Sequence, residues 1–266
     1  KFNESVKVAD VIKEHSEIKD GEHTGVNVSI RGRILNARSF GKLLFYDLLD
    51  QSGKIQLLIN SGEIDELYLK LFENFDIGDI IAVNGEIIKT KKGELSIKVN
   101  ETTILSKSLR TLPEKWHGLK DKETRFRQRY LDLIVNPESK RILQTRSNVV
   151  RLLREYLHAT EFIEVETPIL QSKAGGAIAK PFRTHHNALN LDMYLRIAPE
   201  LYLKRLIIGG FEKVFEIGKI FRNEGIDQTH QPEFTMLESY QAYADMNIVM
   251  DMVEDMCNYV FDNLEI

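Results

Sequence analysis

The sequence predicts two domains, an all-β barrel followed by an α+β domain, and three observations support this. The 266 residues suit one large domain or two. Short β-rich segments with turns fill residues 26–105, whereas residues 121–266 combine long helical patterns with strands. Hydrophobic residues make up 42% of the chain and charged residues 29%, which is ordinary for a protein that buries a real core.

The first domain, residues 1–105, is predicted to be an OB-fold barrel. Five segments separated by Gly-containing turns have strand character: VNVSIRGRIL, LLFYDLLD, KIQLLI, IIAVNGEII and ELSIKVNETTIL. Between the third and the fourth, Ile64, Leu67, Leu71 and Phe75 have the spacing of a helix face. This order of elements is typical of an OB-fold, with another small β-barrel as the alternative.

Residues 106–120 are predicted to be a linker. They contain Pro113 and Gly118 and have no clear hydrophobic period. Trp116 within them is expected to pack between the domains rather than to bind a ligand.

The second domain, residues 121–266, is predicted to be α+β. Helical patterns cover residues 124–134, residues 138–160, PELYLKRLIIGG and NIVMDMVEDMCNYVFDNL, the last of them capped by Asp245. Strand patterns are FIEVETPIL, MYLRI, VFEIGKIFR and FTMLESYQAYA. Two helices have a predicted apolar face, formed by Val149, Leu152, Leu153, Tyr156 and Leu157 in one and by Val249, Met252, Val253, Met256 and Val260 in the other.

Composition excludes several classes of protein. Cys257 is the single cysteine, so neither a disulfide framework within the chain nor a four-thiolate zinc site can form, and both facts fit a reducing compartment such as the cytoplasm. There is no run of 18 apolar residues, so no membrane span is expected. The net charge of −4 neither indicates nor excludes nucleic-acid binding, which depends on local patches.

The segment FRNEGIDQTHQPEFTMLESY has the pattern of a hairpin that carries binding groups. Arg222 and Glu224 alternate with their neighbours, so on a strand both side chains point to one face. On the return strand Phe234, Glu238 and Tyr240 also share a face. Together they offer a guanidinium for a phosphate, a ring for a base and carboxylates for a cation. From spacing alone, a surface hairpin with solvated ion pairs is the favoured interpretation, since charged alternation on strands is common.

Three segments carry a resemblance to a known family. FRNEG followed by H.PEFTMLE is similar to motif 2 of class II aminoacyl-tRNA synthetases, in the version of the lysine enzymes. LREYLHATEFIEVETPIL resembles their motif 1, and GGAIAKPFRTHHNALNLDMYLRIAPELYLKRLIIGG is similar to the lysyl-tRNA synthetases almost throughout. The resemblance covers nearly all of the chain, and it implies an OB-fold followed by the first part of a class II catalytic domain.

The resemblance implies an ATP site. Arg222 corresponds to the catalytic arginine that holds the α-phosphate and contacts the amino-acid carboxylate, and Asn223 lies beside it in the motif. Glu224 corresponds to a glutamate near the adenine, His230 to a histidine near the β- and γ-phosphates, and Phe234 to the ring that stacks on the adenine.

The resemblance also implies a lysine site, formed by Gly176, Glu200, Arg222, Glu238 and Tyr240. An ammonium group in a pocket needs carboxylate and hydroxyl partners, because an unpaired buried charge is costly. Glu238 and Tyr240 can supply them. Close approach of the backbone would explain a glycine at position 176.

The implied reaction has two steps. The carboxylate of L-lysine attacks the α-phosphate of ATP to give lysyl-adenylate and pyrophosphate, and a terminal hydroxyl of tRNA(Lys) then accepts the lysyl group. Such chemistry needs positioning and charge neutralisation rather than a protein nucleophile. Mg²⁺ is the expected cofactor, with its ligands expected beyond Ile266 and none within this sequence.

In the barrel, Phe45, Gln56 and Glu94 match the residues with which the family reads the anticodon. An aromatic ring stacks on an unpaired base, and an amide and a carboxylate read base edges. For Phe45, burial in the barrel core is an equally open alternative. Pro168 ends the motif 1 segment, which implies a homodimer interface there.

The sequence departs from the family pattern in several places. The third class II motif is absent before Ile266, so we expect that these 266 residues alone do not activate lysine at normal rates. Glu161 stands where the family usually has Gly, Gln231 where Asn is common, and Thr229 where some members have Arg.

The sequence is compatible with three other functions. A class II enzyme for aspartate or asparagine shares the barrel and the motifs, but it would need a basic residue toward the substrate side chain. A non-catalytic tRNA-binding or dimerisation fragment would fit the missing motif. A fusion with a membrane lysyl-lipid transferase would carry transmembrane segments, and none is seen in the sequence.

Overall fold

The computed structural model describes residues 5–110, 112 and 119–264. The chain divides into two compact units, Lys1–Asn136 and Pro137–Ile266. The predictions for Pro113, Trp116 and Gly118 lie outside the described residues.

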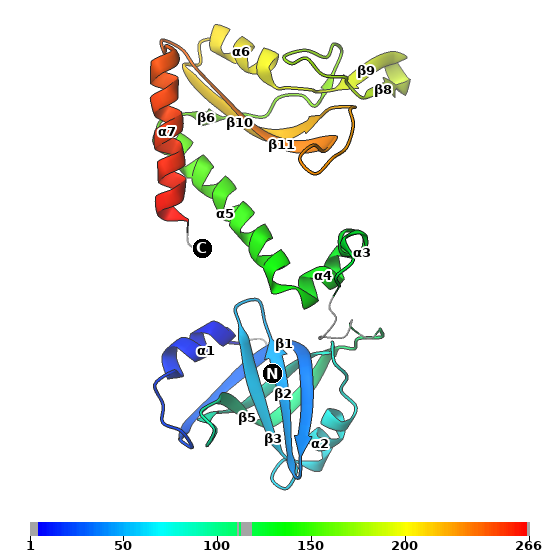
Figure 1. Ribbon diagram of the computed structural model, residues 1–266, viewed down its shortest axis with the longest axis vertical. Helices are drawn as coiled ribbons and strands as arrows, with labels where there is room; N and C mark the ends of the chain where they lie inside the picture. Colours follow the sequence, from blue (N-terminus) through cyan, green and yellow to red (C-terminus); the bar gives the residue numbers. More distant parts are fainter. Residues whose placement is uncertain (1–4, 111, 113–118, 265–266) are drawn as a thin grey trace. The chain divides into compact units, whose positions relative to one another are not determined.

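The first unit is built on a closed five-stranded barrel with the strand order β1-β2-β3-β5-β4 (Figure 1). Its elements are α1 (Val8–His15), β1 (His23–Phe40), β2 (Leu43–Leu49), β3 (Lys54–Asn60), α2 (Glu66–Glu73), β4 (Ile80–Lys89) and β5 (Leu95–Ser106). The strands β3 and β5 pair in parallel and close the barrel, while the other pairs are antiparallel. Five strands with a helix between the third and the fourth confirm the predicted OB-fold.

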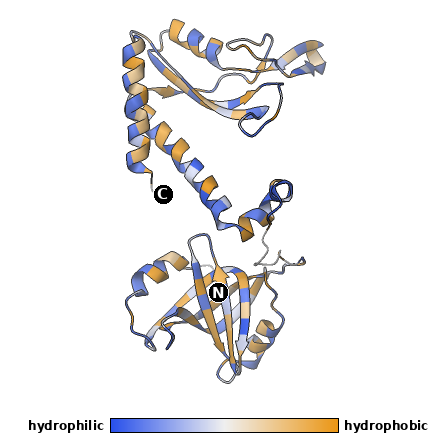
Figure 2. Ribbon diagram, in the orientation of Figure 1, coloured by the Kyte–Doolittle hydropathy of each residue, from blue (hydrophilic) through white to orange (hydrophobic). Residues whose placement is uncertain are grey.

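Alternation along the strands separates the inside of the barrel from its outside. In β3, Ile55, Leu57 and Ile59 are buried, while the residues between them are only partly covered. Bands of alternating hydropathy are visible along the barrel strands in Figure 2. The helix α1, which the sequence analysis did not predict, adds Val8 and Val11 to this core.

The helix α2 is where it was predicted, and its predicted apolar face is confirmed in part, because Ile64 and Phe75 pack against the core and Leu71 is partly buried. Leu67 is 65% exposed, whereas Phe72 is almost fully buried against Tyr46, whose hydroxyl donates a hydrogen bond to the Phe72 carbonyl at 2.7 Å. Asp65 caps the helix, accepting the Leu67 amide at 2.8 Å.

A buried carboxylate ties the chain after β5 to the barrel. Asp79, fully buried, accepts hydrogen bonds from the Lys107 ammonium at 2.8 Å, from the Ser108 amide at 2.7 Å and from the Asp76 amide at 2.8 Å. The predicted linker 106–120 therefore begins with residues that are fixed to the barrel.

The predicted helix 124–134 is two helices, α3 (Lys122–Arg127) and α4 (Arg129–Val135). Gln128 interrupts them with a non-helical backbone at φ −112° and ψ 54°. Arg125 and Arg129 both bind the buried Asp132, at 2.7 and 2.6 Å, so the two short helices are joined by ion pairs.

The second unit contains two small sheets and three α-helices among its described residues (Figure 1). One sheet has the order β11-β10-β6 and the other β7-β9-β8. The elements are α5 (Pro137–Ala159), β6 (Ile163–Glu164), β7 (Leu170–Gln171), β8 (Arg183–His186), η1 (Asn187–Leu189), β9 (Leu191–Leu195), α6 (Glu200–Ile208), β10 (Lys213–Phe221), β11 (Glu233–Gln241) and α7 (Met246–Asn263). This mixture confirms the predicted α+β class, although FIEVETPIL forms only two strands of two residues each.

The predicted apolar face of α5 is confirmed, because Leu152 and Leu157 are buried and the rest of that face is partly buried. The prediction for α7 is confirmed for three of its five residues, because Val260 is buried and two methionines pack on the core. Met252 and Met256 pack on the cluster of Leu157, Phe162 and Phe215, but two other predicted members, Val249 and Val253, are exposed. Asp245 caps α7 as predicted, accepting the Ile248 amide at 3.0 Å.

The turn after α5 takes a left-handed backbone at Glu161, with φ 70°. This conformation favours glycine, because a Cβ atom crowds the neighbouring carbonyl there. Glu161 stands where the family usually has Gly, and the turn here keeps the left-handed backbone that glycine favours. No helix formed by the described residues combines the length and the apolar composition of a membrane span.

Candidate functional site

The antiparallel pair β10–β11 forms the frame of the predicted ATP and lysine site. Its register places Phe234 opposite Ile220, Glu238 opposite Glu216 and Tyr240 opposite Val214. The three predicted residues of β11 share one face, as their spacing indicated. The prediction that Arg222 and Glu224 share a strand face is wrong, because β10 ends at Phe221 and both residues lie in the following loop.

Arg222 is positioned by its backbone and by the Phe234 ring. Its amide donates to the Pro232 carbonyl at 2.9 Å, and its guanidinium carbon lies 5.2 Å from the ring centroid of Phe234. Its Nε is buried and has no hydrogen-bond partner among the described residues. A buried N–H without a partner is unfavourable, so this guanidinium is suited to an acceptor such as a phosphate oxygen.

The loop between the strands is organised by Asp227. Its carboxylate accepts the amides of Thr229 and His230, both at 2.7 Å, and lies 2.8 Å from Nδ1 of His230. Gln231 donates its side-chain amide to the Asp227 carbonyl at 3.3 Å. The hydrogen bond from the Thr229 amide, followed by that from the His230 side chain, lowers the pKa of Asp227 to about 2. The two departures from the family pattern, Thr229 and Gln231, therefore belong to one ordered turn.

The first residues of the loop contact the segment that precedes β8. The Asn223 amide donates to the Lys180 carbonyl at 2.7 Å, and the Glu224 carboxylate accepts the Lys180 amide at 3.3 Å. Asn223 and Glu224 thus both form hydrogen bonds with the backbone of Lys180.

The predicted lysine site is also brought together. The Tyr240 hydroxyl donates to Glu238 at 3.1 Å, and Lys204 pairs with Glu200 at 2.5 Å while its ammonium lies 5.9 Å from the Tyr240 ring centroid. Gly176, at φ 90°, lies against Glu200, since a Cβ there would be 3.0 Å from the Cβ of Glu200. The close approach expected at Gly176 is therefore present.

The electrostatics of this cluster favour a cation. Burial raises the pKa of Glu238, and the carboxylates of Glu200 and Glu216 raise it further, against the lowering effects of Tyr240 and Arg222. Burial, and then the charge of Glu238, raises the pKa of Tyr240, so its hydroxyl keeps its proton. Several carboxylates with incomplete compensation make a site that an ammonium ion would stabilise.

Two residues of the cluster were missed by the sequence analysis. Lys204, one turn after Glu200 on α6, supplies the ammonium at that carboxylate. Arg196 directly follows β9 and is buried in an ion pair with Glu216. A charged residue within the apolar segment MYLRIA was the available signal for Arg196, because a buried arginine requires a partner.

In the barrel, Phe45 and Gln56 lie on the outside of adjacent strands. The core contains Leu44, Tyr46 and Leu48, so Phe45 points to the opposite face and is partly exposed. The alternative of a core position for Phe45 is therefore not supported. The Ser96 hydroxyl lies 2.9 Å from Oε1 of Gln56 and 3.2 Å from the Glu94 carbonyl, which connects two of the three predicted positions.

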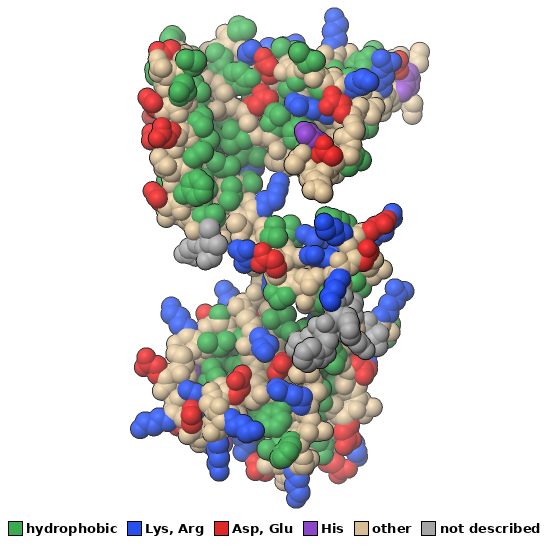
Figure 3. Space-filling view, viewed as in Figure 1, with side chains coloured by type: hydrophobic (Ala, Val, Ile, Leu, Met, Phe, Trp, Pro, Cys, Tyr) green, Lys and Arg blue, Asp and Glu red, His purple; other side chains and the backbone are tan. Residues whose placement is uncertain are grey.

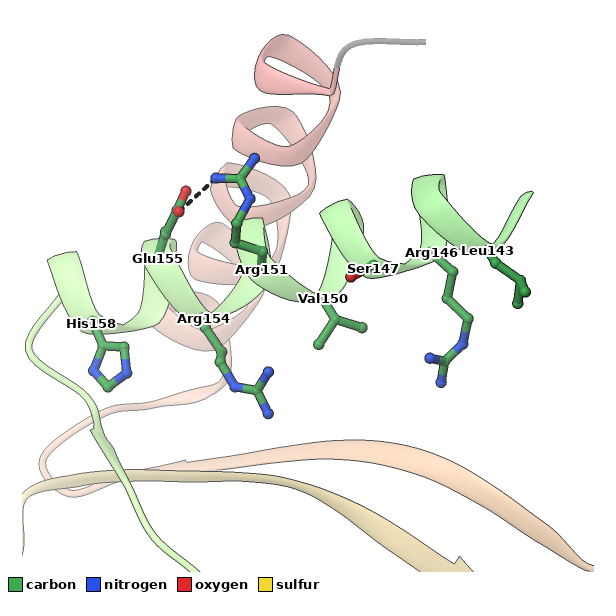
Figure 4. A pocket seen from close by; sticks show the side chains of 8 residues that line it. All are labelled: Leu143, Arg146, Ser147, Val150, Arg151, Arg154, Glu155 and His158. Carbon is green, nitrogen blue, oxygen red and sulfur yellow. Dashed lines mark hydrogen bonds and ion pairs between the residues drawn. The ribbon is translucent and has the colours of Figure 1, made fainter. Parts of the chain in front are cut away.

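A shallow groove runs along one side of α5 (Figure 4). Its lining residues are Leu143, Arg146, Ser147, Val150, Arg151, Arg154, Glu155 and His158. Arg146 donates to Thr235 on β11 at 3.1 Å, and Arg154 pairs with Glu164 on β6 at 2.8 Å, while Arg151 pairs with Glu155 along the helix. Pro168, the predicted interface residue, is exposed, and so are its neighbours Ile169 and Leu170.

Exposed apolar side chains also gather along α7, as the space-filling view in Figure 3 shows. They are Met246, Ile248, Val249, Met250, Val253 and Phe261. Within the described part of the chain, no group of three or more His, Cys, Asp or Glu side chains could hold a metal ion.

Two family models and several curated relatives match this chain. The family model of the class II tRNA synthetases (D, K and N) matches residues 121–266, and that of the OB-fold nucleic acid binding domain matches residues 28–105. The chain is 54% identical over 250 residues to a "Lysine--tRNA ligase" of Clostridium kluyveri, which covers 93% of the chain and 50% of that relative. It is 55% identical over 239 residues to the enzyme of the same name from Moorella thermoacetica, covering 90% of the chain and 49% of the relative.

The chain spans about half the length of the curated relatives that it matches. The family model covers more than half of the chain, and it spans α5, the β10–β11 pair and the cluster around Glu238. The chain therefore belongs to the class II tRNA synthetases of the D, K and N group.

Proposed function

We propose that this chain provides the anticodon-binding barrel and one wall of the activation site of a lysine–tRNA ligase. In this assignment residues 1–105 form the anticodon-binding domain, residues 106–120 the linker, and residues 121–266 the first part of the catalytic domain. The family matches to residues 28–105 and 121–266 support it. The Glu238 cluster carries the substrate assignment, because its carboxylates suit the ammonium of L-lysine better than the carboxylate of aspartate.

The chemistry assigns distinct roles to the β10–β11 hairpin. In the first step the lysine carboxylate oxygen forms a bond to the α-phosphorus of ATP, the bond from that phosphorus to the bridging oxygen breaks, and pyrophosphate leaves. Arg222 holds the α-phosphate and the amino-acid carboxylate, and its unpartnered Nε supports this role. Phe234 offers its ring to the adenine, with Asn223, Glu224 and His230 as further nucleotide contacts.

Gly176, Glu200, Glu238 and Tyr240 form the lysine site in this proposal. The bond between Tyr240 and Glu238 orients the carboxylate, and the raised pKa of Tyr240 keeps its hydroxyl a donor. Lys204 already binds Glu200 with an ammonium group, which supports the affinity of this cluster for a cation. Mg²⁺ is the proposed cofactor, and it finds no ligand set among the described residues.

The experiment that tests this proposal is ATP–pyrophosphate exchange by the full-length protein. Lysine is expected to stimulate exchange, while aspartate and asparagine, the substrates of the related class II enzymes, are not. Stimulation by aspartate or asparagine instead of lysine would overturn the assignment.

For the barrel we propose that Phe45, Gln56 and Glu94 contact the anticodon of tRNA(Lys). The ring of Phe45 on the outer face can stack on a base, and the amide of Gln56 beside it can read a base edge. Binding of tRNA(Lys) and of the same tRNA with altered anticodon bases tests this role. Equal affinity for both would contradict it.

We also propose that the protein is a homodimer and acts in the cytoplasm. The exposed apolar residues near Pro168 and Leu143 support the interface, and the single cysteine supports a reducing compartment. Leu143→Asp is expected to give monomers in sedimentation of the full-length protein. The matched control Leu67→Asp, at an exposed leucine of α2, is expected to leave the dimer intact.

A further inference from the structure

A buried ion pair lies behind the proposed lysine site. The side chains of Arg196 and Glu216 are 2% and 5% exposed, and Nη1 of Arg196 donates to Oε1 of Glu216. The other oxygen of Glu216 accepts the Thr167 hydroxyl at 2.6 Å. The guanidinium also donates to the carbonyls of Lys219 and Thr167, at 2.9 and 3.1 Å. Both groups are therefore fixed by several hydrogen bonds, as a buried pair requires.

The strand β10 is shaped to admit this guanidinium. Gly218 follows Glu216 by two residues and so lies on the same face of the strand. A Cβ atom at Gly218 would overlap Nη2 of Arg196, so only glycine leaves space for the side chain. The position of Arg196 is thus built into the backbone of the site.

Glu216 lies directly opposite Glu238 in the β10–β11 register. Side chains at paired positions share a face of the sheet, and like charges there repel. Four groups act on Glu238: Glu200 from α6 and Glu216 from β10 raise its pKa, and Tyr240 from β11 and Arg222 from the loop lower it. The charge on Glu216 therefore influences whether Glu238 is protonated or ionised.

We propose that Arg196 is a positioning residue for amino-acid selection, which compensates Glu216 and so leaves the opposing Glu238 carboxylate ionised and free for the substrate ammonium. Arg196 does not touch the substrate in this account, since it acts through Glu216. The inference rests on the proposed function, because Glu238 is taken as the partner of the lysine side chain.

The charge balance makes opposite predictions for the two members of the pair. In Arg196→Gln, the uncompensated Glu216 raises the pKa of Glu238. Glu238 then stays protonated to higher pH, and lysine binding is lost in the pH range where Glu238 is protonated. In Glu216→Gln, one like charge is removed and Arg196 remains, so the pKa of Glu238 falls. The double variant Arg196→Gln/Glu216→Gln removes both charges and is expected to return toward the parent protein.

The test is lysine-dependent ATP–pyrophosphate exchange by the full-length protein across the pH range. For Arg196→Gln we expect the acid limb of kcat/KM for lysine to move up by about one pH unit, and KM for lysine near neutral pH to rise about tenfold. KM for ATP is expected to stay within about twofold of the parent value, because Arg222 and Phe234 are untouched. Glu216→Gln is expected to move the acid limb down.

Two results would overturn the inference: an unchanged acid limb in both single variants, or equal rises of KM for lysine and for ATP with no recovery in the double variant. If Arg196→Gln does not fold, two measurements still test the inference: the downward shift of the acid limb in Glu216→Gln, and the pH profile of kcat/KM in the double variant. Failure of the proposed function has a different signature, because the parent protein would then not respond to lysine at all.

Discussion

The two units place their proposed binding groups differently with respect to their cores. The barrel buries a continuous apolar interior, and Phe45 and Gln56 lie on the outer face of its strands. In the second unit, Arg196 and Glu216 are buried, and Glu216 faces the proposed substrate-binding Glu238 across one sheet. Substitutions on the outer face of the barrel should therefore cost little stability. In the second unit the residues beside the site are also part of the core, so substitutions there should affect both binding and stability.

The two units also contain carboxylates of opposite behaviour, the buried Asp79 and the partly buried Glu238. Burial acts to raise the pKa of Asp79, but the hydrogen bonds from Lys107, Ser108 and Asp76 outweigh it and lower the pKa. Asp79 thus stabilises the barrel above its unfolded pKa, and this contribution is lost as the pH falls through the lowered folded value. Burial and two carboxylates raise the pKa of Glu238. The ionised form of Glu238 therefore destabilises the folded state, and protonation in acid removes this destabilisation. The carboxylate that stabilises the barrel thus has a lowered pKa, whereas the one in the proposed cation site has a raised pKa.

The largest effect is expected at Arg222. Arg222→Lys keeps the charge but loses the planar donor fork, and it should lower kcat for lysine-dependent exchange by about 10³-fold. The matched control is Lys219→Arg, the reverse exchange at an exposed pair with Glu233, which should stay within about twofold. Equal effects of the two substitutions in the exchange assay would contradict a phosphate-binding role.

Next in size is the effect of Asp79→Asn on the barrel. The amide cannot accept hydrogen bonds from Lys107, Ser108 and Asp76 as the carboxylate does, so we expect a loss of about 2 kcal/mol in barrel stability at neutral pH. The loss should shrink in acid. Hydrogen exchange of the β4 and β5 amides, measured against pH, reports it. Asp76→Asn, at a 71% exposed partner of the same lysine, should change these rates much less.

The outer face of the barrel should be separable from its fold. Phe45→Ala is expected to lower kcat/KM for tRNA(Lys) by about tenfold or more, because one stacked base contributes about 1–3 kcal/mol. Lysine-dependent exchange without tRNA should not change. Leu58→Ala, opposite Phe45 in the β2–β3 register, removes apolar bulk without a ring and should have a weaker effect. Equal losses for both would point to packing rather than stacking.

The smallest effect is expected at Glu161. Glu161→Gly relieves the left-handed backbone at φ 70° and should stabilise the second unit by up to about 1 kcal/mol. Glu161→Ala, which removes only the exposed carboxylate that lies 3.7 Å from Lys213, should not stabilise it. Thermal unfolding of the two variants beside the parent protein measures the difference, and equal melting temperatures would show that the turn is unstrained.

The sequence predicted those features that local patterns determine. Alternation and turns predicted the five barrel strands, and helical spacing together with Asp245 predicted the last helix with its cap. The shared face of Phe234, Glu238 and Tyr240 also followed from their spacing on one strand. Such patterns depend on the residues of a single element.

What the sequence did not predict depends on tertiary contacts. The strand β10 ends at Phe221, and the Asn223 amide then donates to the Lys180 carbonyl, a contact that local spacing does not reveal. The pairing of Arg196 with Glu216 joins residues on different elements. The spacing in α2 did not show that Phe72 is buried against Tyr46 while Leu67 stays exposed. The roles of the individual site residues stay predictions until they are measured.

The most direct test of the central claim compares lysine with norleucine, which has a similar side chain without the ammonium. In the full-length protein, the ratio of kcat/KM for lysine to that for norleucine in pyrophosphate exchange should be large. Glu238→Gln should lower this ratio by about 100-fold or more, because an ammonium without its carboxylate partner loses several kcal/mol. A ratio that Glu238→Gln leaves unchanged would contradict the claim that this carboxylate selects the substrate.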